Sequence, residues 1–263
     1  MYPYFSIFGK QISTYSILAL LGLAVAMTYT LLTNKKGRAG HVATDDIWNI
    51  FACALIGIFV GGKALGVLVD IPLVIEYWPR ISGDWVNILL VLFSSFVFYG
   101  GLFGCMASTY IYCKRYNVSF SGVFGLMVPA IPLFHSFARI GCFMAGCCWG
   151  IECRHGVIFT HSPVAPAGIP LLPVQLIESA TNLLLFFVLA YISRRIRNRM
   201  NMLPLYLTLY GVARFIIEFF RGDSYRGIFF GVSTSQWISL ALILISALYW
   251  IKKFRNRTVP SSG

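Results

Sequence analysis

PAIPLFHSFARIGCFMAGCCWG, from Pro129 to Gly150, is the stretch that decides the fold, because it places polar chemistry inside an apolar sequence. It holds one His, one Arg and three Cys, together with four small residues, Ala138, Gly141, Ala145 and Gly146. A cation in hydrocarbon costs about 2.5–3.5 kcal/mol even on lenient insertion scales, so Arg139 requires a partner or a polar ligand. Two interpretations are open. Arg139 is capped by carbonyls inside a helix bundle whose small residues serve close packing, or it belongs to an anion site embedded in a membrane.

The composition of the whole chain is that of a membrane protein. Hydrophobic residues make up 58% of its 263 positions and charged residues 11%. The mean hydropathy is +0.75, and together these values exclude an ordinary soluble domain. A spanning helix needs about 20 apolar residues, so the length accommodates about seven spans and no sizeable soluble domain. We expect an all-α polytopic protein with one integral domain over residues 1–257 and a disordered tail over 258–263.

Seven apolar runs are candidate spans: residues 15–32, 47–69, 86–113, 121–149, 174–192, 203–220 and 229–251. The third run contains Tyr99-Gly100-Gly101 and the fourth contains Pro129 and Pro132, which predicts helices that are interrupted inside the membrane. Such interruptions are tolerated where the freed backbone lines a cavity or is covered by protein. The N-terminus lacks the features of a cleaved signal peptide, so the first span is expected to act as its own insertion signal.

The distribution of basic residues predicts the orientation of these spans, since Lys and Arg are retained on the cytoplasmic side. Thirteen of them fall in the segments that follow spans one, three, five and seven, and five fall in the segments on the other side. The pattern predicts an N-terminus outside and a C-terminus in the cytoplasm. These loops account for the net charge of +12, so no nucleic-acid partner is implied. The proline-rich segment 152–172 is expected to form an outer loop over the site.

A second charged motif closes the sixth run, LYGVARFIIEFFRGD. Arg214, Glu218 and Arg221 are spaced i, i+4, i+7 and therefore share one helix face. In the simpler interpretation, Arg214 and Glu218 neutralise each other and hold the bundle together. In the other interpretation, two Arg against one Glu leave an excess of positive charge that a bound phosphate would balance. Lys63 in the second run either snorkels to the interface or adds to that positive charge.

The cysteines and one histidine of the opening stretch are further candidates. Four Cys with the spacing C-x4-C-C-x4-C lie between Cys142 and Cys153. The C-x2-C pairs of structural zinc sites are missing, so no metal site is expected. A disulfide near the outer face, small apolar packing and a thiolate activated by Arg139 are all open. His135 precedes Arg139 by four residues, shares its helix face and is a candidate proton carrier.

The span order and four motifs, YGG, ARIGCFMAGCCWG, PVQLIE and YGVARFIIEFFRGD, resemble the bacterial prolipoprotein diacylglyceryl transferases over nearly the whole chain. The resemblance implies seven transmembrane helices around a central lipid-binding cavity, in the bacterial plasma membrane, with an outward N-terminus. It implies transfer of the diacylglyceryl group from phosphatidylglycerol to the cysteine thiol of a preprolipoprotein, with release of glycerol phosphate. No cofactor is implied.

The resemblance also assigns roles by position. Arg139 matches the Arg of the family signature GRIGNFINGELWG, and Gly150 matches its closing Gly. Tyr15 matches an essential Tyr of the first span, and Lys63 replaces an Arg. The catalytic residues are then expected to be Arg139, Arg214, Glu218, His135 and Tyr99. The substrate-binding residues are expected to be Tyr15, Lys63, Gly100, Gly101, Cys142, Cys147, Gly150 and Arg221.

This sequence departs from the family pattern on the side expected to hold the acceptor. The family's His-Gly-Gly is Tyr99-Gly100-Gly101 here, two signature Asn are Cys142 and Ala145, and a signature Glu is Cys147. Displacement of glycerol phosphate needs cations that stabilise the leaving anion, and the arginines supply them. A phenol is a poor base at neutral pH, so His135 is the substitute candidate for the proton acceptor.

Two other functions are open at this stage. A divergent transferase would use a different acceptor, with Cys142 or Cys147 taking part in the chemistry. A non-catalytic phospholipid-binding protein would retain the phosphate site and release no glycerol phosphate. A transporter would be expected to show paired half-repeats, and the sequence shows none.

Overall fold

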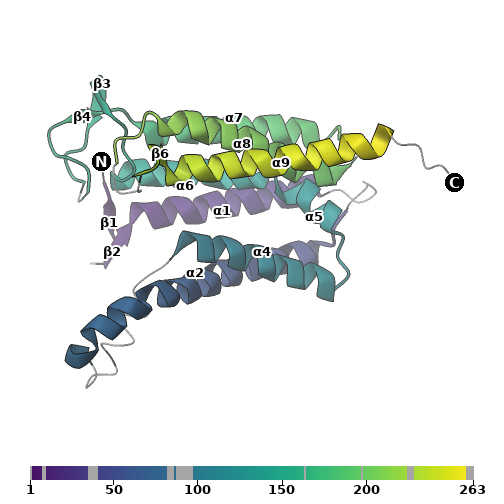
Figure 1. Cartoon of the computed structure of the whole chain (residues 1–263), viewed down its shortest axis with the longest axis horizontal. Helices are drawn as coiled ribbons and strands as arrows, with labels where there is room; N and C mark the ends of the chain where they lie inside the picture. The colour runs from purple at the N-terminus through teal and green to yellow at the C-terminus, as the bar shows by residue number, and fades with distance from the viewer. Residues whose placement is uncertain are drawn as a thin grey trace. The chain divides into compact units, whose positions relative to one another are not determined.

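A computed structural model describes residues 2–7, 10–34, 41–81, 86, 97–162, 164–196, 198–223 and 228–258, and most of these residues are helical (Figure 1). Within the described residues, six helical segments are long and apolar enough to cross a membrane, as the composition predicts for a polytopic protein. The same residues contain three two-stranded sheets. The chain forms two compact units: Met1–Lys35 with Ser121–Gly263, called unit 1, and Lys36–Phe120, called unit 2. The prediction of one domain over 1–257 stays a prediction.

Unit 2 is built on helices α2 (Thr44–Ile81) and α4 (Phe98–Arg115), which pack against each other. Each contributes two glycines four residues apart to the contact, Gly57 and Gly61 on α2 and Gly100 and Gly104 on α4. A Cβ on Gly61 would overlap the carbonyl of Gly100, and a Cβ on Gly104 would overlap that of Gly57. The two backbones therefore approach as closely as small-residue helix contacts in membranes allow.

The third predicted run is not one continuous helix in the described residues, because Val97 is extended and α4 begins at Phe98. Tyr99-Gly100-Gly101 form the first turn of α4, where Gly101 N donates to Val97 O at 3.2 Å. Glycine weakens a helix but does not break its hydrogen bonds, and here the absent side chains serve the contact with α2. Helix α2 also extends beyond the predicted run 47–69. Residues 87–96 of the predicted third span lie outside the described residues.

Unit 1 contains helices α1 (Thr14–Thr33), α5 (Phe120–Met127), α6 (Ala130–Ala145), α7 (Val174–Ser193), α8 (Met202–Glu218) and α9 (Thr234–Thr258), and the 3-10 helix η1 (Arg199–Asn201). The predicted break in the fourth run is confirmed between α5 and α6. Pro129 lacks a backbone N–H and restricts the conformation of the residue before it, so α5 ends before Pro129. Pro132 lies in the first turn of α6, where a missing N–H costs little.

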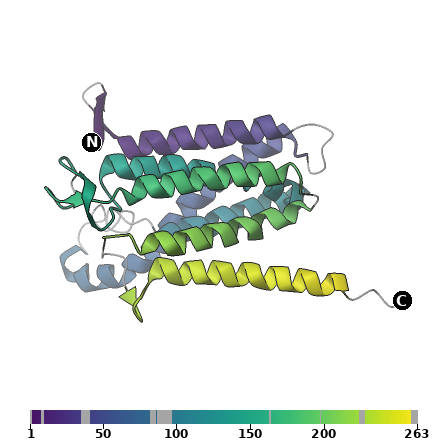
Figure 2. The same cartoon turned by 90° about the horizontal axis from the view of Figure 1, so that it is seen from above.

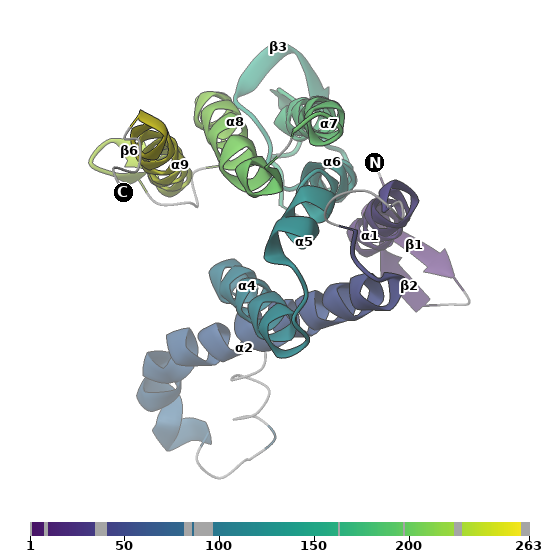
Figure 3. The same cartoon turned by 90° about the vertical axis from the view of Figure 1, so that its right-hand side faces the viewer.

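Five of these helices form a row, seen end-on in Figure 3. Helix α1 contacts α6, α6 contacts α7, α7 contacts α8, and α8 contacts α9. Small residues permit the close contacts at both ends of the row, since Gly22 faces Phe137 and Gly211 faces the backbone of Ser239. Large apolar side chains such as Leu20 and Phe187 point outward, which suits a hydrocarbon surround.

The strands of unit 1 gather at one end of the row, where α1, α7 and α9 begin (Figures 1 and 2). The antiparallel pairs are β1 (Tyr4–Ile7) with β2 (Lys10–Ser13), β3 (Glu152–Ile158) with β4 (Pro170–Leu171), and β5 (Ile228–Phe229) with β6 (Val232–Ser233). The expected loop 152–172 is thus folded, and a small apolar core forms around it from Trp149, Phe159, Ala165 and Leu171. We call this the hairpin end.

The last helix begins later than predicted. The run 229–251 was expected to be helical throughout, but Phe230 and Gly231 have φ of 51° and 73° and form the turn between β5 and β6. Left-handed residues cannot continue a right-handed helix, so α9 starts at Thr234. At its other end α9 includes Thr258, and the remaining residues of the expected disordered tail, 259–263, lie outside the described residues.

Candidate functional site

Buried charges from three helices of unit 1 converge on one carboxylate, that of Glu178 on α7. Arg139 of α6 reaches it with Nε at 2.5 Å from Oε2, and Arg214 of α8 with Nη1 at 3.0 Å from Oε1. Glu178 is 2% exposed and Arg214 is 7% exposed. Guanidinium groups from two separate helices therefore meet, as the sequence hypothesis requires. The anion between them is a side chain of the protein itself.

A third arginine reaches the same carboxylate from beyond the end of α8. Arg221 Nη1 lies 3.0 Å from Glu178 Oε1, while its Nε and Nη2 donate to the two oxygens of Asp223 at 2.9 and 2.7 Å. Burial alone would lower the pKa of this guanidinium, but the hydrogen bonds to Asp223 and the charge of Glu178 outweigh that effect and raise it. Arg221 is therefore a fixed cation at the hairpin end.

Gly150 holds the segment of Arg221 in place. The two residues form an isolated antiparallel bridge, and the flanking bonds run from Ile151 N to Phe220 O at 3.0 Å and from Gly222 N to Trp149 O at 3.1 Å. A Cβ on Gly150 would overlap the side chain of Val174. The expected role of Gly150 in substrate binding stays a prediction, but its packing shows why a side chain is excluded there.

Arg214 is held by a second carboxylate on its own helix. Its Nη2 lies 2.6 Å from Glu218 Oε2, which confirms the predicted i, i+4 pair. The same nitrogen donates to Ser235 Oγ at 3.1 Å, and Ser233 Oγ donates to Glu218 Oε1 at 2.8 Å. Residues at the start of α9 therefore brace the pair, and they fix the direction in which the guanidinium points.

The predicted excess of positive charge is not present in this cluster as the structure describes it. Arg139, Arg214 and Arg221 face Glu178, Glu218 and Asp223, so three cations are balanced by three carboxylates. The helix face that carries Arg214, Glu218 and Arg221 has two Arg and one Glu. Glu178 and Asp223, which lie outside that face, supply the other two carboxylates. A phosphate that binds here must compete with Glu178 for the guanidinium N–H groups.

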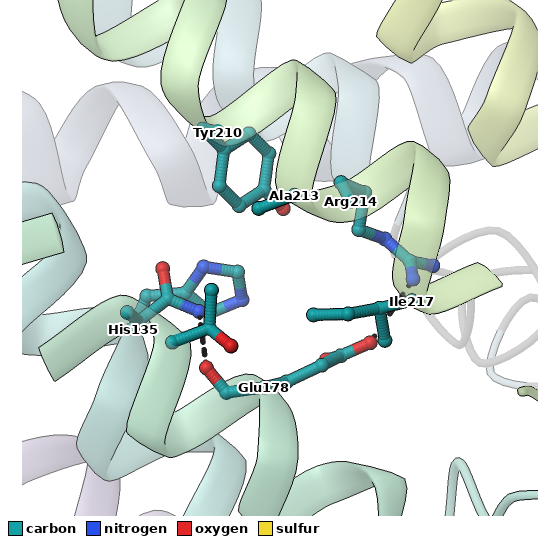
Figure 4. Close-up of a pocket in the computed structure, with 8 residues that line it drawn as sticks. His135, Glu178, Tyr210, Ala213, Arg214 and Ile217 are labelled. Atoms are coloured by element: carbon teal, nitrogen blue, oxygen red, sulfur yellow. Dashed lines mark hydrogen bonds and ion pairs between the residues drawn. The ribbon is translucent and has the colours of Figure 1, made fainter. Parts of the chain in front are cut away.

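A small cavity opens beside Glu178 (Figure 4). Its volume is about 10 Å³, which is about the space that one water molecule needs. Arg139 Nε donates to His135 Nε2 at 3.2 Å, which confirms that the two share a helix face. The cavity has room for about one water molecule beside His135, and not for a lipid headgroup or a diacylglyceryl group. The lining residues are His135, Glu178, Thr181, Asn182, Tyr210, Ala213, Arg214 and Ile217.

Three of the cysteines meet where α6 ends. The sulfur atoms of Cys142, Cys147 and Cys148 all lie within 4.8 Å of one another, a grouping able to hold a metal ion. All seven cysteines fall in described segments and all are free thiols, so the disulfide, one of the three interpretations left open above, is not formed among them. Hydrogen bonds from the other two thiols and the charge of Arg221 hold the pKa of Cys148 below its usual range, while hydrogen bonding to both neighbours raises that of Cys147.

The remaining predicted residues divide between the two units. Tyr15, in the first turn of α1, packs on α6 at Gly141 and is 41% exposed. Unit 2 carries the others, and their participation in the site stays a prediction: Lys63, Tyr99, Gly100 and Gly101. Gly100 has a packing role in the contact with α2, and the side chain of Tyr99 lies outside the described part of the chain.

Sequence reasoning missed the residue at the centre of the site. Glu178 stands in an otherwise apolar run, and a carboxylate inside a span is as costly as Arg139 is and needs a partner for the same reason. That argument would have paired the two. Asp223, Ser233 and Ser235 carry no such signal, because polar residues in a predicted loop need no explanation.

Comparison with known proteins places this chain in a family. The profile of the family described as prolipoprotein diacylglyceryl transferase matches residues 3–252. A phosphatidylglycerol–prolipoprotein diacylglyceryl transferase of Clostridium tetani (strain Massachusetts / E88) is 38% identical over 256 residues, covering 96% of this chain and 98% of the relative. Phosphatidylglycerol–prolipoprotein diacylglyceryl transferase 2 of Clostridium perfringens (strain 13 / Type A) is 31% identical over 254 residues, and the match covers 95% of each chain. The chain belongs to the prolipoprotein diacylglyceryl transferase family.

Proposed function

We propose that this protein transfers the diacylglyceryl group of phosphatidylglycerol to the cysteine thiol of a prolipoprotein and releases glycerol phosphate. The observation that carries the proposal is the convergence of Arg139, Arg214 and Arg221 on one buried carboxylate. Family membership and the names of the relatives support the same reaction. Buried guanidinium groups of this kind stabilise a leaving phosphate in a region where water cannot.

The proposed membrane topology has seven spans around a central lipid cavity in the bacterial plasma membrane. The N-terminus and the hairpin end face outward, and the C-terminus lies in the cytoplasm. The basic residues support this orientation, since Arg194 and Arg195 follow α7, Lys252 and Lys253 lie in the last third of α9, and both helices lead away from the hairpin end. The prolipoprotein cysteine then arrives at the hairpin end, next to Arg221.

The phosphate of the lipid is bound by Arg139 and Arg214 in exchange for part of their contact with Glu178. Both Glu178 and His135 contact Nε of Arg139, which orients the side chain so that phosphate approaches the terminal nitrogens. Glu218 and Ser235 hold Arg214 on its other nitrogen. Glu178 is thus an internal anion that the substrate partly replaces, and the arginines are oriented before the substrate arrives.

Chemistry follows from this arrangement in one displacement. The acceptor thiol loses its proton to His135 Nε2 once that nitrogen has given up its hydrogen bond from Arg139, and the thiolate attacks the glyceryl carbon that bears the phosphate ester. A C–S bond forms, the C–O bond breaks, and its electron pair leaves with glycerol phosphate, whose charge the arginines stabilise. Tyr15, Cys142, Cys147 and Gly150 border the lipid in this scheme. Roles for Tyr99, Lys63, Gly100 and Gly101 rest on the family resemblance alone.

The test is reconstituted transfer from labelled phosphatidylglycerol to a lipobox peptide in lipid nanodiscs. Arg139→Gln is expected to lower kcat by about 100-fold or more, as removal of a preorganised anion-stabilising donor does. Arg154→Gln is the matched control, because Arg154 is an exposed arginine on β3. A peptide with Ser in place of its Cys must stay unmodified.

Two results would contradict the proposal. Lipid bound by the parent protein, lost in Arg139→Gln and never accompanied by released glycerol phosphate, would indicate a binding protein. A lipid adduct trapped on Cys142 or Cys147 would indicate a covalent route to a different acceptor. Transfer that survives Cys142→Ser and Cys147→Ser excludes the second.

A further inference from the structure

The turn that ends helix α6 brings two thiols together. Gly146 has φ of 71°, Gly146 N donates to Phe143 O at 3.2 Å and Cys147 N donates to Cys142 O at 3.1 Å. This is the Schellman arrangement, in which the residue after the left-handed glycine contacts the helix residue five positions earlier. That contact is ordinarily apolar, and here both side chains are thiols. Packing at a helix end therefore accounts for Cys142 and Cys147.

Helix-end packing does not account for Cys148. It has φ of 62°, one of three non-glycine residues with positive φ in the part of the chain that the structure describes. Side chains rarely adopt this conformation, since Cβ crowds the backbone. At Cys148 it accompanies a third sulfur within 4.8 Å of the other two. A disulfide would use two of the sulfurs, whereas a metal ion uses all three.

The turn is also fixed from outside. Ser162 Oγ donates to Gly146 O at 3.0 Å and accepts from Val164 N and Ala165 N. A Cβ on Gly146 would lie 2.5 Å from the Ser162 side chain. Gln175 Nε2, from α7, donates to Cys147 O at 2.7 Å. Segments on both sides therefore hold the thiol-bearing backbone in one conformation, as a preformed ligand site requires.

We propose that Cys142, Cys147 and Cys148 bind one soft metal ion, Cu(I) or Zn(II), through three thiolates. Thiolates select these ions over harder ones. A metal–sulfur bond of about 2.3 Å places the sulfurs about 4 Å apart, so the observed group contracts by less than about 1 Å. Three S–H protons are released, three metal–sulfur bonds form, and no oxidation state changes. With Zn(II) a fourth position stays open to water or another donor.

The surroundings suit the negative charge of such a centre. Three thiolates around a monovalent ion carry a net charge of −2, which needs nearby cations. The Arg221 side chain is within hydrogen-bonding reach of Cys148, and Arg139 lies one turn before Cys142 on α6. Both arginines also contact Glu178. Metal binding thus acts on the same guanidinium groups as the proposed phosphate, although it does not depend on the transferase reaction.

The experiment uses the full-length protein in detergent, reduced and kept anaerobic, without added lipid. Cu(I) and Zn(II) are titrated separately against a competing chelator of known affinity, and thiolate charge-transfer absorption is recorded. We expect one ion per chain and protection of three thiols from alkylation. Cys148→Gly is the decisive variant, since glycine accepts the positive φ and the fold is retained. It is expected to weaken binding about 100-fold or more.

Cys153→Ser is the matched control, because Cys153 lies on β3 near the cluster in sequence but outside the group of three sulfurs. It must bind as the parent protein does. Unchanged affinity in Cys148→Gly overturns the proposal, and so does a disulfide among the three cysteines in protein purified anaerobically without reductant. Because metal binding is measured without substrate, a protein that binds no metal can still pass the transferase assay. A protein that fails the transferase assay can still bind the metal.

Discussion

Units 1 and 2 hold their helices together by opposite means. In unit 2, α2 and α4 meet through glycines, backbone against backbone, with Gly61 at Gly100 and Gly57 at Gly104. In unit 1, α6, α7 and α8 meet through charged side chains centred on Glu178. A glycine contact is complete in itself and has no group to offer a ligand. An ion cluster has donors that can exchange partners, which is why the phosphate site is proposed in unit 1.

Removal of Glu178 is the strongest way to break this comparison. Glu178→Ala leaves Arg139, Arg214 and Arg221 without the carboxylate that they share, and loss of one partner of a buried ion pair costs about 3–5 kcal/mol. Thermal unfolding in detergent measures the effect. The exposed Glu152→Ala on β3 is the control, and it is expected to stay within about 0.5 kcal/mol of the parent. A Glu178→Ala protein as stable as the parent would mean that the cluster does not hold the unit together.

Enlarging a glycine in the other unit is expected to have the next largest effect. Gly104→Leu forces α2 and α4 apart, and overpacking of this kind costs about 1–3 kcal/mol. Ala107 lies on the same helix with its side chain exposed, so Ala107→Leu introduces the same side chain without a clash. Unfolding midpoints of both variants decide the matter. Equal midpoints would show that the glycine contact carries little of the stability.

The smallest expected effect sharpens the comparison within unit 1. Ser235→Ala removes the hydroxyl that accepts from Arg214 Nη2, and a hydrogen bond to a charged group contributes about 1.5–3 kcal/mol. The ion pair with Glu218 persists and keeps the loss of stability near the low end of that range, about 1.5 kcal/mol. The same loss in the transition state corresponds to a rate of diacylglyceryl transfer that is about tenfold lower. Ser246→Ala is the control, since its hydroxyl bonds within α9 to Leu242 O. A wild-type rate in Ser235→Ala would show that orientation of Arg214 does not depend on α9.

Much of the fold was predictable because the length and the ends of a single membrane span depend on residues within that span. Run lengths, apolar composition and the break near Pro129 follow from the sequence alone. The use of Gly100 was not predictable, because glycine can weaken a membrane helix or permit a close contact, and only the neighbouring Gly61 shows that it permits a contact here. The late start of α9 depended on two left-handed residues, Phe230 and Gly231, one of which has no sequence preference for that conformation.

The site was predictable to the extent that charges in apolar runs need partners. Arg139, Arg214 and Glu218 were found by that argument, and the Arg214–Glu218 pair is confirmed. The identity of the central anion was not predicted, because helical spacing relates residues on one helix and Glu178 belongs to a different helix from Arg139 and Arg214. The same limit applies to Cys148, whose approach to Cys142 depends on one backbone angle.

The shared carboxylate has a consequence for biogenesis. Arg139 leaves the ribosome one span ahead of Glu178, and Arg214 follows a further span later. An unpartnered arginine resists partition into lipid, and a carboxylate on the next helix removes most of that resistance. We therefore expect α6 to wait at the translocon until α7 arrives, so that the two enter the bilayer as a hairpin with their charges already joined.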